Sequence, residues 1–224
     1  MNSAYLFDID GTILSVERTF MKSIIEEILN TFSIDPEIIY RIDYAGRTDA
    51  SIFRNLMGEH HHDDDLFEQI KQAYINKMND HLTPDDVNVF DGVEETVEYL
   101  CQNNEYLGLL TGNFKETARI KLRAAGLNDY FGFGAFGCHH TDRNFLPADA
   151  ERSFTEHSGI KLEKRDFIII GDTPHDIRCA RYFGAKSVAV STGHFSFAEL
   201  SKQNPDLTLK SLRSPDKWLE KLSG

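Results

Sequence analysis

The feature that most constrains the fold is a set of short apolar runs separated by stretches with helical periodicity. The runs read as buried strands at Ala4–Phe7, Leu107–Leu110, Phe133–Phe136, Phe167–Ile170 and Ser187–Val190. The helical patterns lie at Glu94–Gln102, Glu116–Ala125, Ala148–His157 and Asp176–Phe183. This alternation predicts an α/β fold: a Rossmann-like, mainly parallel sheet with helices on both faces. In such sheets ligands bind beyond the carboxyl ends of the strands, so functional residues are expected there.

The alternation is interrupted once, directly after the first expected strand. Helical patterns alone occupy the next part of the chain, at Arg18–Phe32, Asp49–Met57 and Leu66–Asn79. This predicts a small helical cap domain over residues 15–85. Residues 1–14 and 86–224 would then form the core.

The composition narrows the classes of partner. The 224 residues carry 36 acidic against 24 basic side chains, a net charge of −12, which disfavours general binding to nucleic acid or to anionic membranes. Cys101, Cys138 and Cys179 are odd in number and show no metal-ligand spacing, so we interpret them as reduced thiols. No apolar run approaches the length of a membrane span and no leader precedes the first strand. We therefore expect a cytoplasmic protein, and the sequence does not predict its oligomeric state.

Polar residues follow three of the expected strands. They form Asp8-Ile9-Asp10-Gly11-Thr12, Thr111-Gly112-Asn113 and Gly171-Asp172-Thr173-Pro174-His175-Asp176. A single Asp after a strand is often a turn former or a helix cap. Four carboxylates at one sheet edge would repel one another unless a cation lay among them, and oxygen-only ligands favour Mg²⁺. The run His60–Asp65 also contains metal-binding residue types, but its place between two expected helices indicates a solvated loop.

Together these motifs resemble the haloacid dehalogenase-like hydrolases. Asp8 to Thr12 is similar to the DxDGT signature, Leu109 to Asn113 resembles the second motif, and Gly171 to Asp176 resembles the fourth. The helical insertion resembles the first type of cap in the family, found in the phosphoglycolate phosphatase-like group. Order, spacing and position after strands all agree, so the resemblance covers nearly the whole chain.

The resemblance implies a role for each matching residue. Asp8 would be the nucleophile that forms an aspartyl-phosphate, and Asp10 the general acid and base. Asp8, the Asp10 carbonyl and Asp172 would hold Mg²⁺, with Asp176 as an indirect ligand or a support for Asp172. The remaining implied phosphate contacts come from Gly11, Thr111, Gly112 and Asn113, with helix capping as the alternative role for Asn113.

One family motif is missing, and two nearby residues are ambiguous. The third motif normally supplies a Lys, but no Lys-Pro occurs in that region; Arg143, 29 positions before Asp172, is the best substitute, ahead of Arg152. A solvated loop charge is the alternative for Arg143. Arg47, in Gly46-Arg47-Thr48-Asp49, either reaches the substrate or is a loop charge before a capped helix. His175 serves either helix entry or catalysis.

The reaction that fits best is hydrolysis of a small phosphorylated metabolite, of the phosphoglycolate or sugar-phosphate kind. A phosphomutase would use the same residues and require a bisphosphate activator. A haloacid dehalogenase is disfavoured because that reaction needs neither Mg²⁺ nor Asp10. A non-catalytic module is disfavoured because all five residues Asp8, Asp10, Thr111, Asp172 and Asp176 are present.

Overall fold

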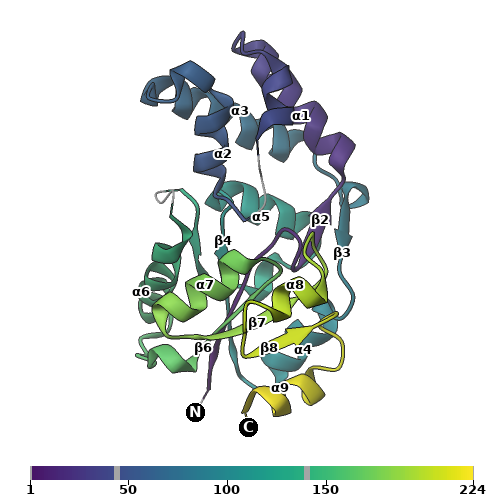
Figure 1. The fold of residues 1–224 in the computed structure, drawn as a ribbon, viewed down its shortest axis with the longest axis vertical. Coiled ribbons are helices and arrows are strands. Elements are labelled where there is room, and N and C mark those ends of the chain that lie inside the picture. The colour runs from purple at the N-terminus through teal and green to yellow at the C-terminus, as the bar shows by residue number, and fades with distance from the viewer. Residues whose placement is uncertain (1, 43–45, 139–141, 224) are drawn as a thin grey trace.

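The computed structural model describes residues 2–42, 46–138 and 142–223. Its centre is a parallel sheet of six strands in the order β5-β4-β1-β6-β7-β8 (Figure 1). The strands are β1 (Ala4–Phe7), β4 (Tyr106–Thr111), β5 (Phe133–Phe136), β6 (Phe167–Gly171), β7 (Lys186–Val190) and β8 (Leu207–Leu209). All five predicted strands are present, and the predicted parallel α/β fold is confirmed. The additional edge strand β8 is only three residues long.

Helices cover both faces of the sheet because side chains along each strand alternate between two apolar clusters. In β1, Tyr5 and Phe7 face a cluster shared with α4 (Val93–Gln102), α5 (Lys115–Ala124) and α9 (Pro215–Ser223). Ala4 and Leu6 face the opposite cluster, shared with α6 (Leu146–Ser158) and α7 (Pro174–Phe183). The short helix α8 (Phe197–Ser201) packs near β7 through Leu200.

The segment after β1 forms a separate group of helices, drawn at the top of Figure 1. These are α1 (Arg18–Thr31), α2 (Asp49–Leu56) and α3 (Asp64–His81). They share an apolar cluster of their own, which also contains Phe114 and Ile120 from the other part of the chain. The position of the three helices follows the prediction closely. The boundaries proposed for a cap domain, at residues 15 and 85, stay a prediction.

The connection between helices α1 to α3 and the sheet was not predicted from the sequence. The chain leaves through β2 (Leu14–Val16) and returns through β3 (Val87–Val89), which pair antiparallel. Leu14 lies opposite Val89 and Val16 opposite Val87. Two three-residue strands give too short an alternation to be read from the sequence. The two passages of the chain are thereby tied into one ribbon.

None of the described helices is long and apolar enough to cross a membrane.

Candidate active site

The predicted site residues meet at the carboxyl edge of the three central strands β4, β1 and β6. In the sheet register Phe7 lies beside both Leu109 and Ile170, so the strand ends stand level with one another. The Asp8 N–H continues the ladder by donating to the Ile170 carbonyl at 2.9 Å. The chain continues from β1 to β4 on one side and from the neighbouring β6 to β7 on the other, so the strand order reverses between β1 and β6, where α/β sheets bind ligands.

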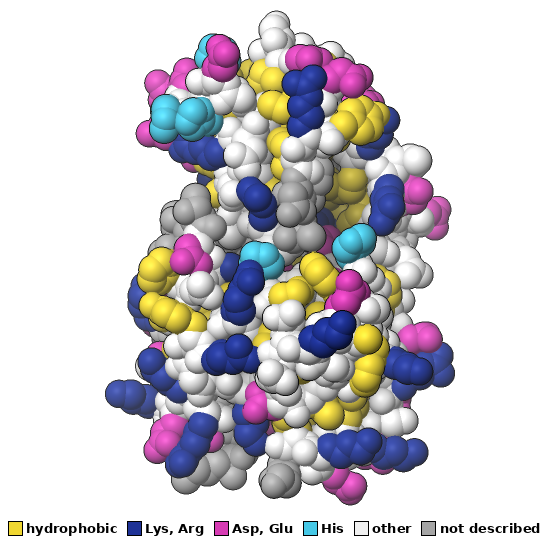
Figure 2. All heavy atoms as spheres, in the orientation of Figure 1, with side chains coloured by type: hydrophobic (Ala, Val, Ile, Leu, Met, Phe, Trp, Pro, Cys, Tyr) yellow, Lys and Arg dark blue, Asp and Glu magenta, His cyan; other side chains and the backbone are white. Residues whose placement is uncertain are grey.

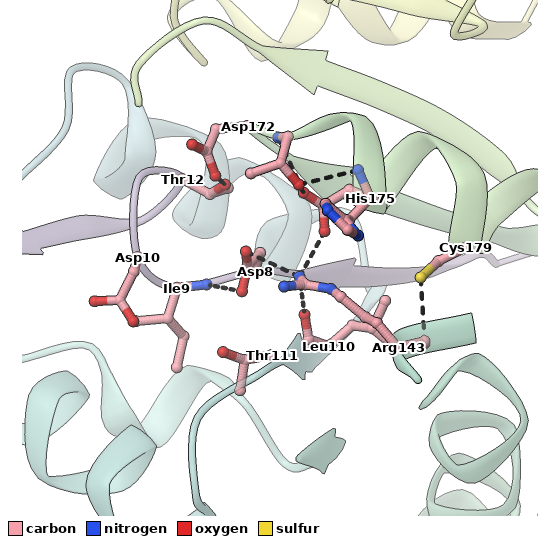
Figure 3. A network of polar contacts seen from close by, with 12 residues as sticks. Asp8, Ile9, Asp10, Thr12, Leu110, Thr111, Arg143, Asp172, His175 and Cys179 are labelled. Atoms are coloured by element: carbon pink, nitrogen blue, oxygen red, sulfur yellow. Dashed lines mark hydrogen bonds and ion pairs between the residues drawn. The ribbon is translucent and has the colours of Figure 1, made fainter. Parts of the chain in front are cut away.

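Three carboxylates converge there. Oxygen atoms of Asp8, Asp172 and Asp176 all lie within 4.8 Å of one another, and all three residues are buried (Figure 3). Burial, reinforced by the neighbouring carboxylates, raises the pKa of Asp172 to about 8. Burial likewise raises the pKa of Asp8 to about 6, against the opposing influence of Arg143. The three buried carboxylates therefore need nearby positive charge to be ionised together.

Arg143 is the cation that the protein itself supplies. It begins a short 3₁₀ turn, Arg143–Phe145, and is only 6% exposed. Its Nη2 lies 2.9 Å from Asp8 Oδ2, also pairs with Asp176 Oδ1, and donates to the Leu110 carbonyl at 3.2 Å (Figure 3). Although burial lowers the pKa of Arg143, Asp176 and Asp8 raise it above its ordinary value. The alternative interpretation as a solvated loop charge is wrong, whereas Arg152 is 69% exposed and pairs with Asp149.

Asp176 is rigid because it also caps helix α7. Its Oδ2 accepts hydrogen bonds from the Thr173 N–H at 3.0 Å and the Thr173 hydroxyl at 2.8 Å. Its other oxygen remains for Arg143. The DTPHD sequence therefore performs two tasks, starting the helix and fixing a carboxylate in the cluster.

Two glycines make room for Asp172. Gly11 has a φ of +83°, and a Cβ there would lie 2.4 Å from Asp172 Oδ2. At Gly193 a Cβ would lie 1.8 Å from the same atom. Thr12, fully buried, donates its hydroxyl to Asp172 Oδ1 at 3.3 Å. A side chain at either glycine would displace this carboxylate, which explains the Gly of the DxDGT sequence in this chain.

The fourth carboxylate, that of Asp10, lies apart from the cluster. It accepts hydrogen bonds from Lys121 Nζ at 2.8 and 2.7 Å and from Asn113 Nδ2 at 2.7 Å. Its side chain is 45% exposed. The suggestion that Asn113 caps the following helix is wrong, because the N-cap residue of α5 is Phe114, whose buried N–H donates to Asp49 Oδ2 at 2.9 Å.

The second motif is placed differently from what its sequence suggests. Thr111 is fully buried, its Oγ1 accepts from the Asn113 N–H at 3.3 Å, and it does not line the pocket described below. Gly112 does line the pocket, but a Cβ there would lie 2.4 Å from the Arg47 carbonyl. The close backbone approach at Gly112 is thus made by the segment that precedes α2, and the Gly112 carbonyl accepts from the Asp49 N–H at 2.7 Å.

A pocket of about 830 Å³ opens above these residues. Figure 2 shows a hollow between two parts of the molecule. We call helices α1 to α3 the helical part, and the six-stranded sheet with the helices that cover it the sheet part. From the helical side Arg18, Arg47 and Tyr74 line the pocket, and from the sheet side it is lined by Asp8, Asp10, Gly11, Gly112, Asn113, Lys121, Arg143, Asp172 and His194, among others. Arg47 is exposed, and Thr48 caps α2 through the Ser51 N–H at 3.2 Å, as expected.

The structure also shows where His175 and the possible metal ligands lie. The His175 ring lies 2.8 Å from Arg178 Nη2 and next to Gly46, where a Cβ would be 2.6 Å from its Cδ2; its role in helix entry or catalysis stays a prediction. Within the described residues, Asp8, Asp172 and Asp176 are the one group of three that could hold a metal. The run His60–Asp65 is exposed, as expected, but only part of it is a loop, because Asp63 caps α3 and Asp64 and Asp65 lie in its first turn.

Sequence reasoning missed Lys121 and Asp49. Both are buried charged residues, at 4% and 9% exposure. The sequence did contain a signal that Lys121 is buried. The i, i+3, i+4, i+7 spacing of a buried helix face is followed by Phe114, Thr117, Ala118 and Lys121. A charge on such a face predicts a buried partner.

Comparison with known proteins identifies the family of the chain. Residues 5–190 match the family model described as haloacid dehalogenase-like hydrolase. The chain is 26% identical over 217 residues to pyrophosphatase PpaX of Halalkalibacterium halodurans, covering 92% of each chain. It is 24% identical over 217 residues to a phosphoglycolate phosphatase of Chromobacterium violaceum, covering 93% of this chain and 92% of that one.

A solved structure shares the fold. The structure of β-phosphoglucomutase from Clostridium difficile superposes with a TM-score of 0.72 at 18% identity, covering 100% of this chain and 98% of that one. At this identity the likeness concerns the fold alone. The family model, which spans most of the chain, carries the assignment: the chain belongs to the haloacid dehalogenase-like hydrolases and is a hydrolase of that family.

Proposed function

We propose that this protein is a Mg²⁺-dependent phosphatase that hydrolyses a small phosphorylated metabolite through an aspartyl-phosphate on Asp8. The observation that carries the proposal is the buried pairing of Asp8 with Arg143 beside Asp172 and Asp176. A carboxylate at the floor of a pocket, with a guanidinium next to it, can receive a phosphoryl group whose charge the guanidinium neutralises. The phosphatase relatives named above support the same reaction class.

The donor set fits a Mg²⁺ ion. Carboxylate oxygens from Asp8, Asp172 and Asp176 lie close enough together to contribute, the family resemblance would add the Asp10 backbone carbonyl, and hard oxygen ligands are those that Mg²⁺ prefers. The raised pKa of Asp172, caused by burial and by neighbouring carboxylates, supports a missing positive charge. When bound, Mg²⁺ would reduce the repulsion between the Asp8 carboxylate and the phosphate and stabilise the charge on the transferring phosphoryl group.

The protein's own residues would perform two displacements in this scheme. In the first, an Asp8 carboxylate oxygen bonds to phosphorus while the ester P–O bond breaks and Asp10 gives its proton to the leaving oxygen. In the second, Asp10 takes a proton from water, the water oxygen bonds to phosphorus, and the bond from phosphorus to Asp8 breaks. Arg143 holds Asp8 in place throughout, and Gly11 and Asn113 line the space beside the reacting groups.

The substrate should carry a second polar or anionic group. Arg18 and Arg47 line the pocket from the helical side, and His194 lines it next to Gly193. In a protein of net charge −12, such side chains favour an anionic ligand locally. A phosphoglycolate-like or sugar-phosphate substrate fits this description, and so does pyrophosphate, for which one relative is named. The helices α1 to α3 would act as a cap that excludes water from the pocket.

The experiment that tests the scheme compares Asp8→Asn with Asp10→Asn. Both variants are mixed with Mg²⁺ and an aryl phosphate with a good leaving group, and the intact protein mass is measured. Asp8→Asn should never acquire a phosphate, whereas Asp10→Asn should accumulate one, with turnover about 10²- to 10⁴-fold below wild type. A phosphorylated Asp8→Asn protein would contradict the scheme. Turnover of phosphoglycolate, sugar phosphates and pyrophosphate by the wild type then ranks the substrates.

A further inference from the structure

Lys121 is a charged side chain in an apolar position. It lies on the buried face of α5, where it follows Phe114, Thr117 and Ala118, and only 4% of it is exposed. Removing an ammonium group from water costs several kcal/mol, so such a residue needs close partners to be compatible with the fold. Its contacts show which partner it serves.

Both Lys121 contacts go to a single carboxylate. Lys121 Nζ lies 2.8 Å from Asp10 Oδ1 and 2.7 Å from Asp10 Oδ2, and Asn113 Nδ2 donates to Oδ2 at 2.7 Å. Three hydrogen bonds therefore fix a carboxylate that is itself 45% exposed to the pocket. Left to solvent, an exposed Asp would sample several rotamers. Here its orientation is determined by the buried helix behind it.

Helix α5, which carries Lys121, is also held in place by a residue of α2. Asp49, at the start of α2, places its Oδ2 2.9 Å from the Phe114 N–H and 3.3 Å from the Thr117 hydroxyl, in the first turn of α5. Burial raises the pKa of Asp49 to about 6, against the opposing charge of Lys121. Lys121 thus lies in the field of two carboxylates, one from each part of the molecule.

We propose that Lys121 is a positioning residue for the acid–base carboxylate of Asp10, acting together with Asn113; the inference rests on the proposed phosphatase function. Proton transfer to a leaving oxygen requires the acid within hydrogen-bond reach and correctly directed. Lys121 and Asn113 hold the carboxylate so that this direction is set before the substrate arrives. Lys121 does not replace Arg143, which contacts Asp8 on the other side of the site.

The test compares Lys121→Met with Lys115→Met. Methionine matches the length of lysine and suits the apolar face, so Lys121→Met is expected to fold, which thermal unfolding checks. Lys115 lies on the same helix but is exposed, so its variant controls for loss of one charge. With an alkyl phosphate and Mg²⁺, kcat of Lys121→Met should fall by about tenfold to a hundredfold, the range of a charge-assisted hydrogen bond, with KM changed little. Lys115→Met should match wild type.

Two further measurements separate positioning from structural support. In an Asp10→Asn background, Lys121→Met should cause no additional loss of kcat, because the group it positions is already absent. In addition, the single variant Lys121→Met can be mixed with dinitrophenyl phosphate, whose leaving group needs no proton. Rapid-quench measurement should then show that this variant forms the phosphoenzyme near the wild-type rate.

The outcomes against the proposal are distinct. Additive losses in the Asp10→Asn background, or a loss confined to KM, would overturn the positioning role and indicate a structural or substrate-binding lysine. An active wild type with an unaffected Lys121→Met variant would also overturn it, while leaving the proposed function intact. An inactive wild type would overturn both.

Discussion

Arg143 Nη2 lies 2.9 Å from Asp8 Oδ2, and the two buried residues are 135 positions apart in the sequence. The same nitrogen also bonds to Asp176. Arg143 therefore aligns the proposed nucleophile and joins it to a carboxylate that is fixed at the start of α7. A lysine ammonium could make these contacts only as a point charge, whereas the planar guanidinium directs them.

Arg143→Met should reduce kcat/KM by about a hundredfold or more, because an aryl phosphate would meet Asp8 without the neutralising cation. Arg143→Lys should recover part of the loss. Arg152→Met is the matched control, since that guanidinium is 69% exposed and pairs with Asp149 in its own helix. Steady-state kinetics on all three variants checks the prediction; equal activity of Arg143→Met and Arg152→Met would contradict it.

Removal of divalent metal should abolish turnover, and Mg²⁺ should restore it. Excess Ca²⁺ should inhibit, because its larger and looser coordination misplaces the attacking oxygen. Binding can be measured separately from activity: Mg²⁺ should raise the thermal unfolding midpoint of the wild type but not of Asp172→Asn.

Asp65→Asn provides the control for the metal experiment. Asp65 is an exposed carboxylate in the His60–Asp65 run, so this variant should respond to Mg²⁺ like the wild type. Full activity in chelator, or loss of the thermal shift in Asp65→Asn, would argue against the proposed magnesium site.

Arg47→Ala should raise KM for phosphoglycolate or pyrophosphate, whichever the enzyme prefers, by about tenfold or more, as expected when a charged hydrogen bond is lost. Hydrolysis of p-nitrophenyl phosphate should change little, since its neutral ring offers no anionic group. Arg41→Ala is the control, because Arg41 lines a neighbouring depression together with Arg47 but does not line the pocket above the carboxylates. Equal losses on both substrates would indicate a role of Arg47 in the fold or in the chemistry.

Asp49→Asn should change how stability depends on pH. Burial raises the pKa of Asp49 from 3.8 to about 6 in the folded protein, so folding takes up a proton between these values. The free energy of unfolding therefore falls as pH rises through this window, by about 3 kcal/mol in total for this group. An Asn at this position cannot titrate, so the variant should gain stability relative to wild type between pH 4 and pH 7.

Urea unfolding of Asp49→Asn and wild type across this pH range measures the difference directly. Asp85→Asn, which changes an exposed carboxylate in the same segment, should follow the wild type. Parallel stability curves for Asp49→Asn and wild type would show that Asp49 is not the group responsible.

The parts of the structure that could be predicted from the sequence are those encoded locally. A buried strand leaves a run such as Phe167–Ile170, and the residue type after it, Asp172, identifies the chemistry at the sheet edge. Arg143 was identifiable by its position before the fourth motif. The strand and the Asp after it lie within a few residues of chain, whereas Arg143 is found from the order and spacing of the motifs.

The parts that escaped prediction depend on contacts between distant residues. Asp49 and Lys121 look like ordinary charges of helical surfaces, and they are buried because the start of α2 and helix α3 lie against α5. The ribbon of β2 and β3 pairs residues about 70 positions apart through strands too short to leave a pattern. Thr111 shows the converse: its motif suggested a pocket residue, whereas the fold buries it completely.

The position of Phe114 has a consequence for recombination between relatives. This side chain begins a helix of the sheet part, yet it is fully buried in the apolar cluster of α1 to α3, against Phe53 and Phe67. Exchanging only the inserted helices for those of another protein would leave a large aromatic ring facing a surface that was never shaped to receive it. A chimera that keeps its solubility should therefore transplant Phe114 and Ile120 with the insertion, although both lie outside it in the sequence.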